Sequence, residues 1–399
     1  MNVLRRLVWV FALVAFPFAA VSMQACPFCD GEKGPTMTLQ FEEAAMVIYG
    51  HFENPRTTGD FGGGESDLVF EAVLKPHDAI KGLKKITLPK HIADSKLKFV
   101  VFCDVYKGKI DAYKGTQVSD ASEMRRDIDD ILKNQDKSQP ERLRVAFDYL
   151  NSPEIEVAMD AYREFARAPY SDYQNMAKTL PADKIAGWLQ DPKTPAYRYG
   201  LYASLLGHCG NEKHAAILFE MINDPEKRKV SGLHGLMAAY TMLEPKKGWS
   251  FLTELVQDKE KPFLVRYSGL QTMRFLWDNR LDLISKDEKI AKTTVVKGVA
   301  NVLAVSDMAD FAVEDLRKWQ RWDHCDQVLD IFGKKGFTTP IIRKSILRYA
   351  LQCPSPRAVA FVKAQEALER EWVQETRELL NLETAPPPTP AKKDTPAKK

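Results

Sequence analysis

The sequence predicts a multidomain α+β protein in which a small β domain precedes a longer all-α region. Two observations carry this prediction: apolar residues recur with a period near two between residues 44 and 113, and near 3.6 from about residue 120 onward. The chain has 399 residues, which is enough for two or three domains. Its formal net charge is only +3, so we expect no general attraction to nucleic acid and no nucleic-acid partner.

The first 22 residues have the pattern of a secretory signal peptide. Arg5 and Arg6 precede an apolar run over residues 7–20, and small residues follow it. This run is shorter than the roughly 20 residues that a membrane-spanning helix needs. We therefore expect an exported protein, periplasmic or secreted, with no membrane span after cleavage. A retained anchor and twin-arginine export are the alternatives.

Two cysteines follow the leader in the sequence Cys-Pro-Phe-Cys, at Cys26 and Cys29. Because an exported chain enters an oxidising compartment, a structural disulfide is the favoured interpretation. Cys103 lies in the strongest predicted strand, residues 99–106, and is the expected partner of Cys26 or Cys29. The remaining cysteines are compatible with buried thiols on helices.

The same spacing also occurs in thiol-disulfide oxidoreductases, whose first thiol is activated at the start of a helix. Here the leader precedes the motif and a glycine- and proline-containing stretch follows it, so the activating helix is not predicted. Redox chemistry at Cys26 and Cys29 is kept as the alternative function. A metal site needs two further ligands at a suitable spacing, and none is found, so we expect no metal or other cofactor. The residues before Cys26 match a lipid-attachment signal poorly, and we expect no lipid anchor there.

The β domain is expected over residues 26–118. Its apolar runs are separated by turn residues, including a long polar loop over 53–66 and a tight turn at 106–109. The runs lie at 44–52, 67–75, 84–90, 99–106 and 110–113. About five short strands at this spacing predict a small barrel or sandwich.

The order of these segments resembles the netrin-like module, an OB-type barrel. The resemblance is carried by the cysteine motif after the leader, the strand at 44–50, "AVLKPHDAIKG", "ITLP" and "FVVF". It implies the fold alone, because the metalloproteinase inhibitors of this family use a cysteine at the mature N-terminus and Cys26 is not expected there. OB barrels can bind nucleic acid, but we interpret the lysines between the strands as a solvated face; they are Lys81, Lys84, Lys85, Lys90, Lys96 and Lys98.

The all-α region is expected over residues 140–382, after a linking helix within 119–139. Proline recurs at predicted helix starts and is followed by arginine, as in Pro140 with Arg144, Pro195 with Arg198, Pro262 with Arg266, and Pro340 with Arg343. Helix pairs of this kind resemble HEAT-type repeats, which implies a stacked α-solenoid. The last segment, 383–399, has five prolines and no apolar periodicity and is expected to be disordered.

The sequence contains no motif that identifies a reaction. It lacks a G-x-S-x-G elbow, an H-E-x-x-H pair and a phosphate-binding glycine loop. A cluster of tryptophan and arginine, made of Arg317, Trp319, Arg321 and Trp322, is a possible binding patch, although core packing is the favoured interpretation. We therefore expect an exported, non-enzymatic scaffold that binds a protein partner through its solenoid surface.

Overall fold

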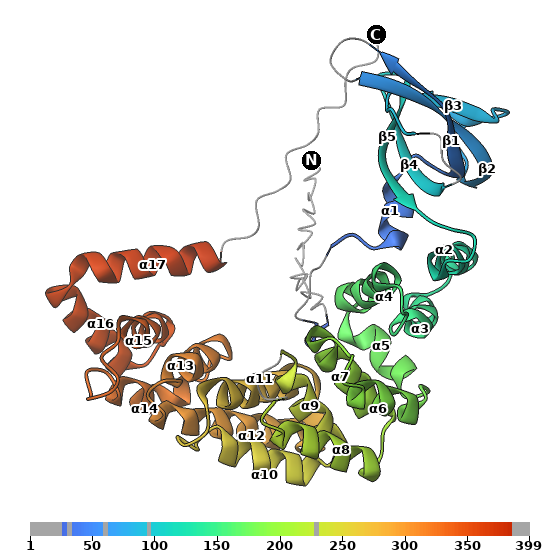
Figure 1. Ribbon diagram of the computed structural model, residues 1–399. Helices are drawn as coiled ribbons and strands as arrows, with labels where there is room; N and C mark the ends of the chain where they lie inside the picture. The colour runs from blue at the N-terminus through green and yellow to red at the C-terminus, as the bar shows by residue number, and fades with distance from the viewer. Residues whose placement is uncertain (1–25, 30–33, 59–62, 94–96, 227–230, 385–399) are drawn as a thin grey trace, which may run out of the picture.

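The structure is a computed structural model that describes residues 26–29, 34–58, 63–93, 97–226 and 231–384. It is an α+β protein, with a five-stranded sheet near the N-terminus and a long helical region after it. Figure 1 shows that the molecule is an arc with the sheet at one end and the last described helix at the other. The expected signal peptide (1–22) lies outside the described residues, as does the expected tail (383–399) beyond residue 384. No helix in the described part of the chain is both long and apolar enough to cross a bilayer.

The sheet is antiparallel, has the order β3-β2-β1-β4-β5 and is not closed. The expected barrel is therefore corrected to an open sheet. The strands are β1 (Met46–Thr58), β2 (Gly63–Lys75), β3 (Lys85–Leu88), β4 (Lys98–Tyr106) and β5 (Lys109–Gln117), and the short helix α1 (Met37–Glu43) precedes them. The turn between β4 and β5 is a two-residue hairpin in which Lys107 and Gly108 both have positive φ, 50° and 75°.

The polar loop expected over residues 53–66 is mostly strand. β1 and β2 stay paired as far as Thr58 and Gly63, and the pairing shifts register between Glu53 and Arg56. Polar side chains continue the ladder here because the backbone, not the side chains, makes the inter-strand hydrogen bonds.

The two faces of the sheet pack into different hydrophobic cores. Along β1, Val47 and Tyr49 join the core that continues into the helical region. Their neighbours Met46 and Ile48 belong to a separate core with β2 and β3. Because successive strand residues point to opposite faces, this alternation decides which side chains can reach the helices.

The helices form a curved array of stacked pairs. They are α2 (Glu123–Asn134), α3 (Gln139–Tyr149), α4 (Ile155–Arg167), α5 (Tyr170–Ala177), α6 (Ala182–Gln190), α7 (Tyr199–Cys209), α8 (Glu212–Asn223) and α9 (Leu233–Leu243). The array continues with α10 (Pro245–Leu255), α11 (Phe263–Asn279), α12 (Glu288–Asn301), α13 (Ala309–Lys318), α14 (Cys325–Asp330), α15 (Pro340–Gln352), α16 (Pro356–Leu368) and α17 (Arg370–Thr384). The helices α5, α7, α9 and α11 pack on one another in turn, as do α13, α15 and α17.

The four proline-arginine openings all lie at helix starts. Pro140 and Pro340 occupy the first turns of α3 and α15, and Pro262 precedes α11. Pro195 precedes a 3-10 turn (Ala196–Arg198) that leads into α7. Proline suits these positions because the first helical N–H groups have no intrahelical acceptor.

The junction between α1 and the helical array contains two buried carboxyl groups. Asp160 accepts a hydrogen bond from the Met37 N–H at 2.7 Å and so fixes the start of α1. Asp127 lies nearby, on α2, beside a cavity of about 30 Å³ that Asp160 also lines, and its Oδ2 atom has no hydrogen-bond partner. Burial raises the pKa of Asp127 to about 8 and that of Asp160 to about 7. No group of three or more His, Cys, Asp or Glu side chains in the described residues could hold a metal ion.

Candidate functional site

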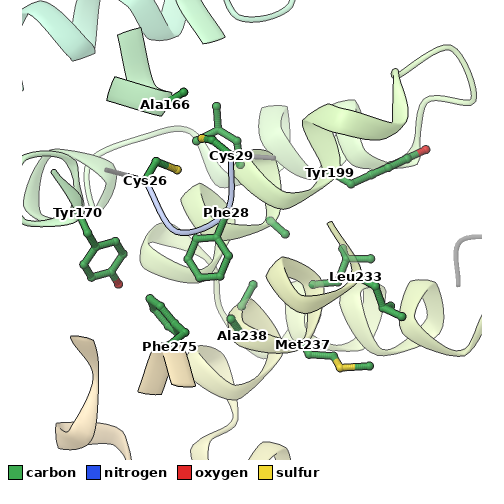
Figure 2. Packing of buried hydrophobic residues seen from close by; sticks show 14 of the residues in the cluster. Cys26, Phe28, Cys29, Ala166, Tyr170, Tyr199, Leu233, Met237, Ala238 and Phe275 are labelled. Atoms are coloured by element: carbon green, nitrogen blue, oxygen red, sulfur yellow. The ribbon is translucent and has the colours of Figure 1, made fainter. Parts of the chain in front are cut away.

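The Cys-Pro-Phe-Cys segment is inserted into the core of the helical array. Phe28 is only 1% exposed, and its ring centroid lies 4.6 Å from that of Phe275 and 5.6 Å from that of His234. Figure 2 shows Cys26 and Cys29 on either side of Phe28, surrounded by residues of α4, α5, α7, α9 and α11. The segment therefore packs as a hydrophobic anchor that attaches the N-terminal end of the chain to the helices.

Glycines on α7 and just before and within α9 make room for this anchor. A Cβ atom on Gly200 would lie 2.4 Å from the carbonyl oxygen of Phe28. A Cβ on Gly235 would lie 2.7 Å from the Cα of Gly200, so the two helices also approach each other closely at this point. The backbone atoms concerned cannot move aside independently, and only glycine fits.

The two thiols of the anchor are buried, at 5% and 7% exposed for Cys26 and Cys29. The Sγ atom of Cys26 lies 3.8 Å from the hydroxyl of Tyr173, which in turn lies 3.1 Å from the Ser204 hydroxyl. Burial raises the pKa of the Tyr173 hydroxyl. Residues 26–29 form a turn, and the first described helix after them begins only at Met37. Thiol-disulfide exchange requires access to the attacked sulfur and gains from a helix N-terminus, and this arrangement offers neither.

Cys103 does not meet Cys26 or Cys29, and the expected pairing is corrected. Cys103 lies opposite Met46 in the register of β4 with β1, in the core on the far face of the sheet. Cys26 and Cys29 belong to the core that includes the helices. Cys103, Cys209, Cys325 and Cys353 are present as thiols. Burial raises the pKa of the Cys103 thiol to about 12.

The expected patch of Arg317, Trp319, Arg321 and Trp322 is not one surface. Arg317 is 4% exposed and is held by Glu314 and Glu383, at 2.7 and 2.9 Å. The Trp319 ring stacks on that of Trp277, with 4.3 Å between centroids. The Trp322 ring meets that of Tyr349 edge-on at 5.0 Å, and Arg321 pairs with Asp323. α13 ends at Lys318, and Gln320 has a φ of 55°, so the chain turns and the four side chains diverge.

A groove of about 630 Å³ crosses α11, α13 and α15. Its aromatic part is built by Tyr267 and Phe311, whose ring centroids are 4.8 Å apart, with Phe263 stacked on Tyr267 at 5.8 Å. Ile341, which is 63% exposed, projects from the first turn of α15 beside them. Trp319 also lines the groove, so one member of the expected patch contributes to it.

Ion pairs between consecutive odd-numbered helices hold the groove together. Arg274 of α11 donates to both carboxylate oxygens of Asp315 of α13, at 2.8 and 2.9 Å. Arg348 of α15 donates to Glu314 of α13 at 2.7 Å and also pairs with Glu383 of α17. Burial outweighs the attraction of Arg274 and raises the pKa of Asp315 to about 6. The Nε–H of Arg274 is shared by both oxygens of Asp315, and such charge-assisted contacts fix the relative positions of the helices.

Exposed or half-buried charges line the groove at Asp278 on α11, Lys318 on α13 and Lys344 on α15, whereas Asp310 on α13 is buried. Asp278 makes no ion pair within the described part of the chain. Lys318 on α13 and Lys344 on α15 likewise make none with described residues. The α11 wall thus presents an acidic group and the α15 wall a basic one.

The lysines between the strands do not form a separate binding face. Lys85 pairs with Asp67 at 2.9 Å, and Lys98 pairs with Glu71 and Asp120, at 2.8 and 2.6 Å. Lys90 donates to the carbonyl oxygen of Ala112 at 3.1 Å. Lys96 lies outside the described residues. Because neighbouring carboxylates and a carbonyl group bind these lysines, we interpret the lysine-rich face as a solvated surface and not as a binding site.

Sequence reasoning missed most of the groove. The α11 side chains that line it or flank it, Phe263, Tyr267, Arg274 and Asp278, are spaced by 4, 7 and 4 residues, which places them on one helical face. That spacing was available in the sequence. The identity of the neighbouring helices that complete the groove could not be read from the sequence, because it depends on the order in which the helices stack.

Comparisons with known proteins add little to this description. No protein-family model matches the chain, and no curated protein matches it. Among solved structures, human deoxyhypusine hydroxylase in complex with glycerol is similar to it at 14% identity, with 65% of this chain and 96% of that chain covered. The TM-score is 0.24, so this likeness carries no argument about fold or mechanism.

The match does correct one expectation. The protein matched is a hydroxylase, so the expectation that this chain is not an enzyme is contradicted and is not maintained below. The same TM-score gives no support to any particular activity.

Proposed function

We propose that this chain is a scaffold whose groove across α11, α13 and α15 holds an extended segment of a partner protein. The observation that carries the proposal is the groove itself, which is lined by the rings of Tyr267, Phe311 and Trp319 and bears Asp278 on α11 and Lys344 on α15. Aromatic-lined grooves of this kind suit proline-containing segments, which are already extended and lose little conformational entropy on binding.

The acidic and basic walls favour one direction for the bound segment. A basic side chain of the partner is expected against Asp278 and an acidic one against Lys344. The ion pair of Arg274 with Asp315 leaves those two groups engaged with each other, so they shape the groove and do not compete for the ligand.

We infer that the helical array is an α-solenoid of HEAT-like type, and that the sheet is related to the OB-type netrin-like module. We also propose that the protein acts outside the cytoplasm, in the periplasm or as a secreted protein, on the basis of residues 1–22.

Comparative capture tests the proposed function. Ile341→Glu places a charge on the rim of the groove, and Val359→Glu places one at a position of α16 with nearly equal exposure, 63% against 60%. Both side chains are solvent-facing, so neither variant is expected to unfold. We expect a protein that wild type and Val359→Glu enrich equally and that Ile341→Glu loses by about tenfold. Equal enrichment by all three chains would contradict the proposal.

A further inference from the structure

We propose that the chain's own C-terminal segment, residues 385–399, occupies the groove across α11, α13 and α15 and competes there with the partner. This inference rests on the proposed function in one respect, namely that the groove accepts an extended protein segment. It goes further, because it assigns an occupant and a mode of regulation.

The described chain ends at the edge of the groove. Glu383, in the last turn of α17, receives a hydrogen bond from Arg317 at 2.9 Å and one from Arg348. Arg348 lines the groove, on α15. Figure 1 shows the C-terminal end of α17 directed along the inner side of the arc. The residues after Thr384 therefore begin beside the α15 wall.

The length of the segment matches the width of the groove. Lys392 follows Thr384 by eight residues, which span about 25 Å in a polyproline II conformation. Packed helix axes, such as those of α13 and α15, lie about 8–10 Å apart, and α11 is less closely packed on α13, so the crossing from α15 to α11 takes at least about 16–20 Å. A segment that begins at the α15 wall is thus long enough to cross α13 and bring a lysine side chain to α11.

The order of residues in the segment matches the order of surfaces in the groove. Pro386, Pro387, Pro388 and Pro390 come first and would lie over Trp319, whose ring stacks on Trp277 next to Asp278. Lys392 and Lys393 follow and would reach the α11 wall, where Asp278 has no ion-pair partner among the described residues. Proline rings pack on aromatic faces, and the lysines find the unpaired carboxylate.

Because the segment is part of the same chain, its effective concentration at the groove is in the millimolar range. A partner segment must displace it, so binding of the partner is weakened until the tail is removed or outcompeted. The tail therefore raises the partner concentration that is needed for binding, without any change in the fold of the helices.

The test uses the full chain with a photoreactive benzoylphenylalanine in place of Thr389. We expect an adduct within one chain, mapped by mass spectrometry to residues 263–279, 309–319 or 340–352. Asp278→Lys should lower its yield by about two- to tenfold, since attraction at an exposed site becomes repulsion. The matched variant Glu220→Lys, on the exposed side of α8, should leave the yield unchanged. Adducts elsewhere in the chain, or adducts between two copies, would overturn the proposal.

A second measurement separates this inference from the proposed function. A chain ending at Thr384 keeps every residue that the structure describes and is titrated with a labelled peptide of residues 385–399. We expect the full chain to bind this peptide at least about tenfold more weakly, because its own tail competes. Equal binding by both chains, or no binding to the shorter one, overturns the tail assignment. Failure to capture any partner, with peptide binding intact, overturns only the proposed function.

Discussion

The guanidinium of Arg317 donates a hydrogen bond to the carboxylate of Glu383 at 2.9 Å, which joins the buried side of α13 to the last turn of α17. Arg317 also contacts Glu314, the acceptor of Arg348, so three helices share one network of charges. This network holds the C-terminal end of the array against the groove. It also explains why Arg317, a member of the possible binding patch, is buried.

Removing the ring of Phe28 should destabilise the chain more than any exposed substitution. We expect Phe28→Ala to lower the free energy of unfolding by about 3–5 kcal/mol, because the ring is fully buried between Phe275 and His234. Ile155→Ala, at an exposed position at the start of α4, should change it by less than about 0.5 kcal/mol. Chemical denaturation of both variants gives the comparison, and equal midpoints would show that the anchor is dispensable.

Alanine should have opposite effects at two helical glycines. Gly200→Ala forces a Cβ to within 2.4 Å of the Phe28 carbonyl oxygen and should cost about 1–3 kcal/mol or more. Gly187→Ala meets no atom within 4 Å on α6 and should stabilise by about 0.5–1 kcal/mol through helix propensity. Thermal unfolding of the two variants should shift in opposite directions. A stable Gly200→Ala would mean that the anchor does not pack on α7 as described.

Stability should fall as the pH rises from about 4 to about 8. The carboxyl groups of Asp127 and Asp160, with pKa values near 8 and 7, keep their protons in the folded chain after the unfolded chain has lost them. Within this window each group lowers the free energy of unfolding by up to about 1.4 kcal/mol per pH unit. Above its folded pKa it causes no further change. The charges that face them are Glu123, Asp130, Glu164, Arg163 and Lys114.

Replacement of one buried acid isolates this effect. Asp127→Asn cannot ionise and should flatten the pH dependence measured by urea unfolding between pH 4 and 9. Asp136→Asn, at an exposed position after α2, should keep the wild-type slope. If Asp127→Asn and wild type lose stability in parallel, the acidic junction is not the source of the dependence.

The thiol of Cys103 should stay unmodified in the folded protein. It is buried and its pKa is raised to about 12, so little thiolate is present at pH 8. Maleimide should label Cys209, which is half-buried, before Cys103, and should reach Cys103 only after unfolding. A peptide linking Cys103 to Cys26 or Cys29 in a non-reducing digest is the outcome that this structure does not allow.

Local patterns predicted the elements of this fold well. The change of period near residue 120 separates the sheet from the helices, the prolines at 140, 195, 262 and 340 open helices, and the turn at Lys107 and Gly108 is where a tight turn was expected. These features depend on neighbours in the sequence. The closure of the sheet depends on how distant strands meet, and the structure shows the antiparallel sheet without the expected closure.

The candidate site could not be predicted in the same way. Phe28 meets Phe275, and Tyr267 meets Phe311, across helices whose stacking order no local pattern specifies. The Cys103 pairing failed for a simpler reason, since a strand residue faces one side of the sheet and its position in the register decides which. The side that Cys103 faces could be assigned only once β1 and β4 were paired.

Site-specific photo-crosslinking in the cells that produce the chain tests the groove most directly. A benzoylphenylalanine replaces Ile341 on the rim of the groove or Val359 on α16, two positions of nearly equal exposure. The account predicts a discrete adduct with another protein from position 341 that is absent from position 359. Equal adducts from both positions, or none from position 341, would contradict the claim that this groove holds a partner.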